Sequence, residues 1–236
     1  MGVQHHALTP PVPAGPGLAR KLYTLVVIHQ AADKSNDQPT PSTSTTRVAA
    51  SSTTRRRLLL GKKLRGFGIG FFNGYGGKVE PGESVEAAAA RELTEEAGIV
   101  ATDLHRRGVL TFTWSDQPGD LAWEVHVFGC TQYTGTPVVT DEMEPAWFEA
   151  DVLDGGNAVA GLPHDRMWAD DAHWYPILLD LVRQGDERPH ACAYSEPAAD
   201  GTSGPLFTGA FEFRNVTELV GGEVRRVAEG LPALPR

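Results

Sequence analysis

The sequence predicts one mixed α/β domain in which a β-sheet packs between helices. Several stretches have the alternating, β-branched character of strands, and two others place apolar residues at helical spacing. These elements follow one another along the chain without an internal repeat, which favours a single mixed domain. With 236 residues, the chain can bury one sizeable core and carry extra segments outside it.

The first predicted elements are two strands, residues 22–28 (LYTLVVI) and residues 57–63 (RLLLGKK), which we expect to pair as a hairpin. Residues 33–55 between them are rich in Ser, Thr, Pro and Asn, so we expect a long disordered insertion. A hairpin tolerates this because each doubling of loop length costs only about 0.6 kcal/mol. Residues 1–20 are expected to be a flexible N-terminus.

Residues 84–97 predict the first helix. Ser84 is a suitable N-cap, and Gly98 can adopt the left-handed conformation that ends a helix. With about 100° of rotation per residue, Ala90, Leu93 and Ala97 share one apolar side. This helix therefore has a face that can pack on the sheet.

Three glutamates, Glu92, Glu95 and Glu96, share a neighbouring arc of this helix that is about 100° wide. Like charges at this spacing repel, and the last turn of a helix disfavours anions. Arg91 relieves only part of this repulsion. A divalent cation would reverse it, because hard cations prefer clustered carboxylate oxygens. The alternative is an exposed acidic helix face.

The remaining elements complete the sheet and add a second helix. We predict that helix at residues 174–182, with Ile177, Leu178, Leu181 and Val182 facing inward and Gly185 beyond its end. A second disordered insertion is expected at residues 186–205, so residues 21–228 would form the domain. Further strands are predicted at residues 109–113, 124–131, 145–149 and 207–213, and the type of residues 217–228 is left open.

Residues 77–99, GKVEPGESVEAAAARELTEEAGI, fit a long template without a mismatch. The template is Gly, five residues, Glu, seven residues, Arg-Glu, an aliphatic residue, any residue, Glu-Glu, any residue, Gly and an aliphatic residue. Its positions are Gly77, Glu83, Arg91, Glu92, Leu93, Glu95, Glu96, Gly98 and Ile99. This is the Nudix box, so the chain resembles the Nudix hydrolases. The resemblance implies a Nudix α/β/α sandwich and cleavage of a nucleoside diphosphate linkage with Mg²⁺, or Mn²⁺ in its place.

The flanking sequence is similar to eukaryotic MutT homologues that hydrolyse 8-oxo-dGTP and 2-hydroxy-dATP to monophosphate and pyrophosphate, which cleanses the nucleotide pool. The segments that carry this similarity are residues 22–26, 65–68, 72–79, 125–128, 140–143 and 167–171. Two departures concern the pocket. Trp123 stands where the family usually has methionine, and Phe72 stands where it has tryptophan.

The resemblance also implies roles for individual residues. The metal shell would consist of Gly76, Glu92, Glu95, Glu96 and Glu142, with Gly76 acting through its carbonyl. Glu95 or Glu96 would position or deprotonate the water, and Arg91 would orient the glutamates; Glu83 is expected to support the site without binding metal. The nucleotide would contact Thr24, Lys63, Asn73, Trp168, Asp170 and Asp171, and the base pocket would be lined by Phe67, Phe112 and Trp123. Lys62 is adjacent to Lys63, and the choice between them is left open.

Asp170 and Asp171 carry a further hypothesis. In a partly dry pocket two adjacent carboxyls should not both ionise, so one pKa should rise. One protonated and one ionised carboxyl would offer a donor and an acceptor to a purine edge, and an exchange of the proton would let the pocket accept either oxidised base. Two other functions remain open: a Nudix pyrophosphatase for dinucleoside polyphosphates or nucleotide sugars, and a non-catalytic nucleotide sensor.

The composition limits the classes of partner that we expect this chain to bind. The net charge of −9 and isoelectric point of about 5.3 argue against broad binding to nucleic acid or anionic membranes. We expect a monomer that binds a purine nucleoside triphosphate. Cys130 and Cys192 are the only cysteines, too few for a disulfide framework. A cytoplasmic location is expected, with nuclear or organellar locations left open.

Overall fold

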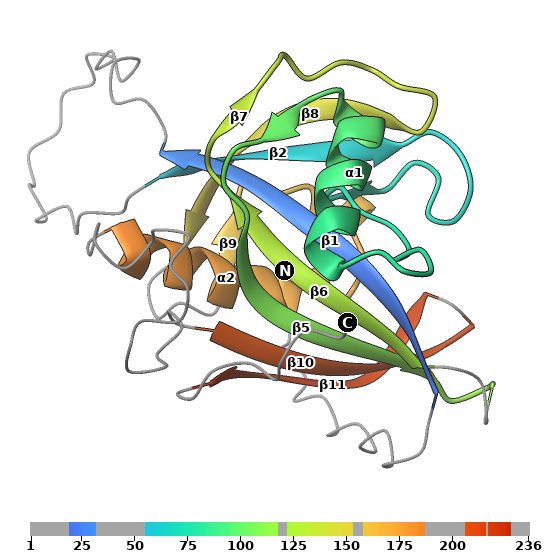
Figure 1. The fold of residues 1–236 in the computed structure, drawn as a ribbon. Coiled ribbons are helices and arrows are strands. Elements are labelled where there is room, and N and C mark those ends of the chain that lie inside the picture. Colours follow the sequence, from blue (N-terminus) through green and yellow to red (C-terminus); the bar gives the residue numbers. More distant parts are fainter. Residues whose placement is uncertain are drawn as a thin grey trace, which may run out of the picture.

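The structure is a computed structural model that describes residues 19–31, 55–117, 122–152, 158–186, 206–215 and 217–227. Within these residues nine strands form one mixed sheet, and two shorter strands pair separately (Figure 1). The elements are β1 (Arg20–Ala31), β2 (Arg56–Lys63), β3 (Phe72–Asn73), α1 (Val85–Ala97), β4 (Val100–Ala101), β5 (His105–Trp114), β6 (Ala122–Cys130), β7 (Tyr133–Thr134), β8 (Met143–Val152), β9 (Val159–Ala160), a 3-10 turn (His164–Arg166), α2 (Asp171–Asp186), β10 (Leu206–Arg214) and β11 (Glu218–Val227).

The order of the large sheet is β11-β10-β5-β6-β1-β2-β8-β9, with β3 paired to β2. β1 runs parallel to β6, β10 runs parallel to β5, and the other pairs are antiparallel. The predicted hairpin of β1 and β2 is confirmed, and its register begins at Ala31 opposite Arg56. The connection between these two strands lies outside the described residues.

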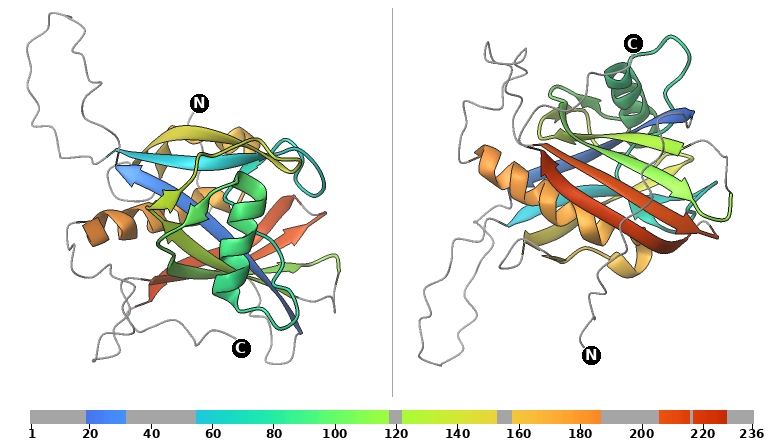
Figure 2. Two further views of the ribbon diagram at one scale, coloured as in Figure 1. Left: turned by 45° about the horizontal axis from the view of Figure 1, so that its top comes forward. Right: turned by 90° about the horizontal axis from the view of Figure 1, so that it is seen from below.

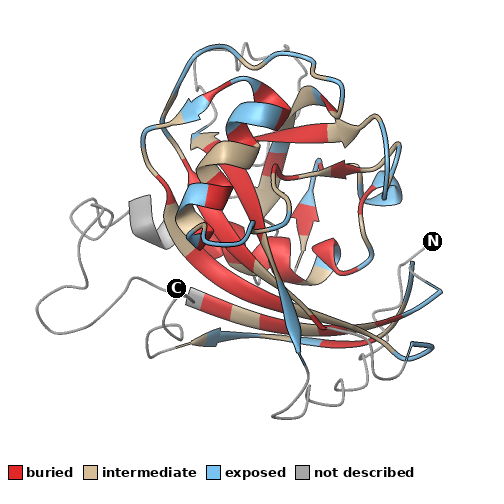
Figure 3. Ribbon diagram, turned by 45° about the vertical axis from the view of Figure 1, so that its right-hand side comes forward, coloured by how far each residue is buried: buried red, intermediate tan, exposed pale blue. Residues whose placement is uncertain are grey.

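The two faces of β1 belong to two different hydrophobic clusters. Leu25 and Val27 pack in a cluster with α2, whereas Val26 and Ile28 pack in a cluster with α1. Because side chains alternate across a strand, the two helices must cover opposite faces of the sheet. Figure 2 shows this layering from two sides, and Figure 3 shows the buried residues between the layers. The predicted α/β/α sandwich is confirmed.

The ends of α1 are those that the sequence predicts. The Ser84 hydroxyl accepts a hydrogen bond of 3.1 Å from the Ala87 amide, and Gly98 ends the helix with φ 68°. Leu93 and Ala97 are fully buried, and Ala90 packs against the same cluster as a half-buried residue. The apolar side therefore faces the sheet, which turns the acidic arc toward the loop that precedes the helix.

The second helix differs from its prediction at both ends. α2 runs from Asp171 to Asp186 and contains Pro176, so Gly185 lies inside the helix and not beyond it. Its buried face begins with Trp174, while Ile177 is only half-buried. Of the insertion expected at residues 186–205, Asp186 belongs to α2, and residues 187–205 lie outside the described part of the chain. No helix in the described part is long and apolar enough to cross a membrane.

The predicted strands are all present, and most are longer than predicted. Residues 145–149 form the middle of β8, and the open segment 217–228 is largely strand β11. The four strands that were not predicted, β3, β4, β7 and β9, have two residues each. Such short strands arise from tertiary pairing and leave no periodic pattern in a sequence.

Candidate active site

A cavity of about 630 Å³ opens between the sheet, the loop after β2 and the segment that leads into α2. This volume lies in the range of about 300–1,000 Å³ that is usual for small-molecule sites. All nine residues predicted to contact substrate line it, together with two of the predicted metal ligands: Thr24, Lys63, Phe67, Asn73, Phe112, Trp123, Trp168, Asp170, Asp171, Gly76 and Glu142. The structure thus brings together residues that lie far apart in the sequence.

Eight of the residues that line the cavity are aromatic. The Phe67 ring is stacked on the Trp168 indole with centroids 4.9 Å apart, and it meets Trp123 edge-on at 5.8 Å. Trp123 also contacts Trp114 at 4.8 Å and Tyr23 at 4.7 Å. These rings provide flat, apolar surfaces on which a purine base can stack.

Four further aromatic residues of the cavity were missed by sequence reasoning: Tyr23, Trp114, Trp174 and Phe213. For the first two a signal existed in the alternation of strands. Tyr23 lies two residues before the core residue Leu25, and Trp114 lies two residues after Phe112, so each points to the same face as its neighbour. Trp174 was assigned only as the first residue of the predicted helix, and Phe213 only as the last residue of a predicted strand.

Asp170 and Asp171 are both buried at the start of α2. The Trp174 indole N–H donates to Asp170 Oδ2 at 3.0 Å, and the Trp168 amide donates to Asp171 Oδ2 at 3.0 Å. Burial raises the pKa of Asp170 to about 7, despite the hydrogen bond from Trp174. Burial and the neighbouring charge of Asp170 raise the pKa of Asp171 well above its usual value. The pair can therefore hold a proton in the neutral pH range.

Two other polar residues, Thr24 on β1 and Asn73 on β3, line the cavity. Thr24 is buried, and within the described residues its hydroxyl has no hydrogen-bond partner. The side-chain oxygen of Asn73 accepts a hydrogen bond of 2.8 Å from the Gly74 amide, which fixes the orientation of the Asn73 amide group. The Asn73 amide group, which lines the cavity, can form new hydrogen bonds with a ligand.

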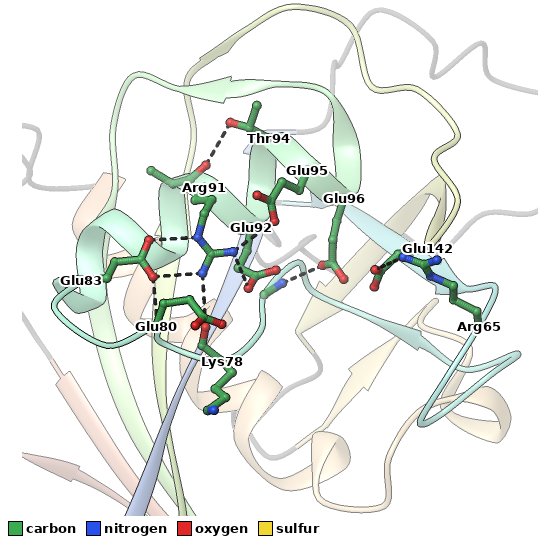
Figure 4. Close-up of polar contacts among 12 residues, drawn as sticks. Arg65, Lys78, Glu80, Glu83, Arg91, Glu92, Thr94, Glu95, Glu96 and Glu142 are labelled. Atoms are coloured by element: carbon green, nitrogen blue, oxygen red, sulfur yellow. Dashed lines mark hydrogen bonds and ion pairs between the residues drawn. The ribbon is translucent and has the colours of Figure 1, made fainter.

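The glutamates of α1 lie beside the cavity and are organised by Arg91. Its guanidinium group donates to both carboxylate oxygens of Glu83 at 2.9 and 3.0 Å, to Glu92 at 2.8 Å and to Glu95 at 3.0 Å (Figure 4). Glu83 thus anchors Arg91, as expected of a supporting residue. Glu95 stays 59% exposed, whereas the Glu92 side chain is 14% exposed.

The glycine-rich loop passes very close to these carboxylates. The Gly76 amide donates to Glu96 Oε2 at 2.8 Å, and a β-carbon at Gly77 would lie 2.5 Å from Glu92 Oε1. A β-carbon at Gly76 would lie 2.0 Å from the Thr24 carbonyl oxygen, so no larger residue fits. Glycine is required here because the loop lies between α1 and the edge of the sheet.

Lys63 and Arg65 balance the charges at the mouth of the cavity. The Lys63 ammonium lies 3.0 Å from Glu96 Oε1 and 3.1 Å from Glu142 Oε2, and Arg65 also pairs with Glu142. Lys62 points elsewhere, because its ammonium pairs with Glu144 at 3.3 Å and does not line the cavity. Of the two lysines, Lys63 lines the cavity and Lys62 does not.

The environment shifts the protonation of these carboxyls in opposite directions. Burial raises the pKa of Glu96 and of Glu92, although Lys63 and Arg91 respectively oppose that shift. Hydrogen bonds from Arg65 and Lys63 lower the pKa of Glu142. Glu96 and Glu92 are therefore the carboxyls whose ionisation would benefit most from a further positive charge nearby.

Within the described residues, no three His, Cys, Asp or Glu side chains surround one point as a ready-made set of metal ligands. The chemistry of the site nevertheless fits a hard divalent cation. Five carboxylates meet only three cationic side chains here, and oxygen is the donor that such cations prefer. The groups are Glu83, Glu92, Glu95, Glu96 and Glu142 with Lys63, Arg65 and Arg91.

Comparison with known proteins agrees with this architecture. The chain is 42% identical over 126 residues to an oxidized purine nucleoside triphosphate hydrolase of Danio rerio, covering 53% of this chain and 74% of that protein. It is 41% identical over 122 residues to the enzyme of the same name from Mus musculus, covering 52% of this chain and 71% of that protein.

A solved structure gives the same fold. The mutator MutT protein of Bacillus halodurans superposes with a TM-score of 0.51 at 18% identity, covering 86% of this chain and 97% of that one. The NUDIX domain family matches residues 43–177, which is more than half of this chain. The box on α1, the sandwich fold and these matches together establish that the chain belongs to the Nudix hydrolase family.

Proposed function

We propose that this enzyme hydrolyses oxidised purine nucleoside triphosphates, such as 8-oxo-dGTP and 2-hydroxy-dATP, to the monophosphate and pyrophosphate. The proposal rests on one observation, namely that two sites lie next to each other. An aromatic cavity with a buried aspartate pair opens directly beside the carboxylate cluster of α1. The names of the zebrafish and mouse relatives support the same substrate class.

Nudix hydrolases generally use divalent metal ions, and we propose Mg²⁺, with Mn²⁺ as a substitute. Its ligands would be the Gly76 carbonyl and carboxylates of Glu92, Glu95, Glu96 and Glu142. When bound, such an ion neutralises phosphate oxygens and lowers the pKa of water. Two of the proposed ligands, Glu96 and Glu142, already bind the Lys63 ammonium, so their oxygens suit a cation.

Glu96 is our choice for the residue that deprotonates the attacking water. It is 2% exposed, and the Gly76 amide fixes one of its oxygens. Its raised pKa brings it closer to the range in which a carboxylate is an effective general base. Arg91 would hold Glu92 and Glu95 in place, and Lys63 would bind the phosphates. Glu95 remains the second candidate for the base.

For base recognition we propose stacking on Trp168 and hydrogen bonding to Asp170 and Asp171. Because both carboxyls are buried and share a raised pKa, one protonated and one ionised group can coexist near neutral pH. Transfer of the proton between them would exchange donor for acceptor and accommodate either an oxidised guanine or an oxidised adenine. Phe67, Phe112 and Trp123 would enclose the base, with Thr24 and Asn73 at its edge.

The deciding experiment is a substrate panel with Mg²⁺ and a coupled pyrophosphatase to convert product to phosphate. We expect the largest kcat/KM for 8-oxo-dGTP or 2-hydroxy-dATP over dGTP and dATP. Faster hydrolysis of a dinucleoside polyphosphate or a nucleotide sugar would assign the enzyme to another Nudix pyrophosphatase class. Binding of oxidised nucleotides without any turnover would identify a nucleotide sensor.

We further propose that residues 21–228 act as one domain in a monomer located in the cytoplasm, without a nucleic acid polymer or membrane as partner. The buried free thiol of Cys130 is consistent with a reducing compartment. Size-exclusion chromatography with light scattering tests the monomer, and a dimer would contradict it. Imaging of a tagged protein tests the compartment, and accumulation in the nucleus or an organelle would correct it.

A further inference from the structure

One lysine, Lys63, bridges two of the proposed metal ligands. Lys63 lies at the end of β2, Glu96 in the last turn of α1 and Glu142 immediately before β8. The ammonium contacts Glu96 Oε1 at 3.0 Å and Glu142 Oε2 at 3.1 Å. A single side chain therefore joins three elements at the point where the cavity meets the carboxylates.

We propose that Lys63 couples binding of the divalent cation to binding of the triphosphate. In the free enzyme its ammonium neutralises Glu96 and Glu142, and when nucleotide enters it moves to the phosphates and releases these two carboxylates. This inference rests on the proposed function, because it takes the triphosphate as the ligand that enters the cavity.

The Lys63 ammonium and the divalent cation compete for the same oxygens of Glu96 and Glu142. Like-charged cations repel, so a divalent ion that binds Glu96 and Glu142 must displace an ammonium that already contacts both. The Lys63 side chain is 21% exposed, so displacement into the cavity without a new partner leaves a charge that is incompletely solvated. Without nucleotide, the divalent cation therefore binds more weakly than it would if Lys63 did not occupy these oxygens.

A triphosphate removes this disadvantage. Lys63 lines the cavity, and phosphate oxygens are strong acceptors for an ammonium group. Once the ammonium has moved, Glu96 and Glu142 are free to bind a cation. Because coupling between two ligands is reciprocal, metal must then strengthen nucleotide binding by the same factor by which nucleotide strengthens metal binding.

Arg65 strengthens this arrangement from the solvent side. It pairs with the other oxygen of Glu142, Oε1, so two cations hold that carboxylate in the free enzyme. Since Arg65 is 61% exposed, its pair is screened by solvent and contributes less than that of Lys63. Lys63 is therefore the residue whose removal should change the coupling most.

The neighbouring lysine supplies a matched control. Lys62 also lies in β2 and also carries an ion pair, but its partner is Glu144 at 3.3 Å, outside the cavity. The change Lys62→Met removes the same charge from the same strand without touching the proposed ligands. Any effect of net charge alone must therefore appear equally in the Lys62 and Lys63 variants.

The test is calorimetric titration of Mn²⁺ into wild type, Lys63→Met, Lys63→Gln and Lys62→Met, with and without an α,β-methylene purine deoxynucleoside triphosphate. Binding of Mn²⁺ to the analogue itself is subtracted. In wild type and Lys62→Met we expect the analogue to tighten Mn²⁺ binding by about tenfold or more, within the usual range for coupled sites. In both Lys63 variants we expect tighter Mn²⁺ binding without nucleotide and a coupling factor below about 5, the lower end of the usual range.

Two outcomes would overturn the inference. One is weaker Mn²⁺ binding without nucleotide in both Lys63 variants, which would mean that Lys63 organises the carboxylates for the ion. The other is an unchanged coupling factor in both variants. Failure of the proposed function looks different: wild type would not bind the purine analogue, while the nucleotide-free titrations would still compare the variants.

Discussion

The ring of Phe67 lies nearly parallel to the indole of Trp168, with centroids 4.9 Å apart and an angle of 12° between the planes. Phe67 is 53% exposed and lies in a loop whose glycines at positions 66, 68 and 70 all have positive φ. The loop thus presents an aromatic side chain to a tryptophan that a purine base would also use. The contribution of Trp168 to base binding is therefore the first quantity to measure.

Replacement of Trp168 by Leu should raise KM for 8-oxo-dGTP about 10- to 100-fold and change kcat less. Loss of one aromatic platform costs about 1–3 kcal/mol per stacked base, and 1.4 kcal/mol corresponds to a factor of ten. Steady-state kinetics give this value. Inhibition by inorganic triphosphate provides the control, because it lacks a base and should retain its Ki. A parallel loss of both would place Trp168 in the core and not in the base site.

The aspartate pair predicts an unusual dependence of stability on pH. Each pKa is raised above its usual value of 3.8, so the native pair holds protons that the unfolded chain releases. The contribution of the pair is fully present below about pH 4 and is lost as pH rises through about 7. The change Asp171→Asn should therefore reduce the loss of unfolding free energy between about pH 5 and about pH 8.

Urea denaturation of wild type and Asp171→Asn at the two pH values measures this difference. Other shifted groups, such as Glu96, are common to both proteins and cancel in the comparison. The substitution is nearly isosteric, and the asparagine oxygen can still accept the hydrogen bond of the Trp168 amide. If both proteins show the same pH dependence, Asp171 has no raised pKa in the native state and the proton-exchange hypothesis is wrong.

The change Glu96→Gln should lower kcat about 100-fold or more while nucleotide still binds. The amide can keep the hydrogen bond from the Gly76 amide, but it cannot accept a proton from water, and general-base catalysis contributes about 10²–10⁴-fold. Single-turnover kinetics and a binding titration separate the two effects. Glu95→Gln is the comparison that identifies the base, since Glu95 is the exposed candidate. Near-normal turnover of Glu96→Gln would assign the role elsewhere.

The glycine loop gives a stability prediction with an internal control. At Gly76 a methyl group would meet the Thr24 carbonyl at 2.0 Å, so Gly76→Ala should destabilise the protein by about 1–3 kcal/mol or more. At Gly66 no atom lies within 4 Å of the added carbon, and only φ 72° opposes alanine, at about 1–2 kcal/mol. Thermal unfolding of both variants tests the ranking. A larger loss for Gly66→Ala would contradict it.

The sequence predicts the bounds of α1 better than the end of α2 or the two-residue strands. α1 was bounded correctly because its signals are local: a hydroxyl cap at Ser84 and a glycine at Gly98. The end of α2 was misplaced because Gly185, usually a terminator, is tolerated inside a helix when packing supplies enough stability. The two-residue strands exist only through pairing with distant partners, which a linear pattern does not encode.

In the candidate site, too, some features were predicted from the sequence and others were not. The family resemblance named the cavity residues, and the structure brings all the predicted substrate contacts to one cavity. What the sequence could not give was the ion pairing: that Lys63 and not Lys62 faces the carboxylates, and that Arg91 contacts three glutamates at once. These depend on strand orientation and side-chain rotamers.

The crowding of indole rings around the cavity has a practical consequence. Of the five tryptophans in the chain, Trp114, Trp123, Trp168 and Trp174 line it, and only Trp147 does not. The intrinsic emission of the protein should therefore be dominated by chromophores that a bound purine would quench directly. Ligands can be screened optically on the unlabelled wild-type chain, without any reporter group being introduced.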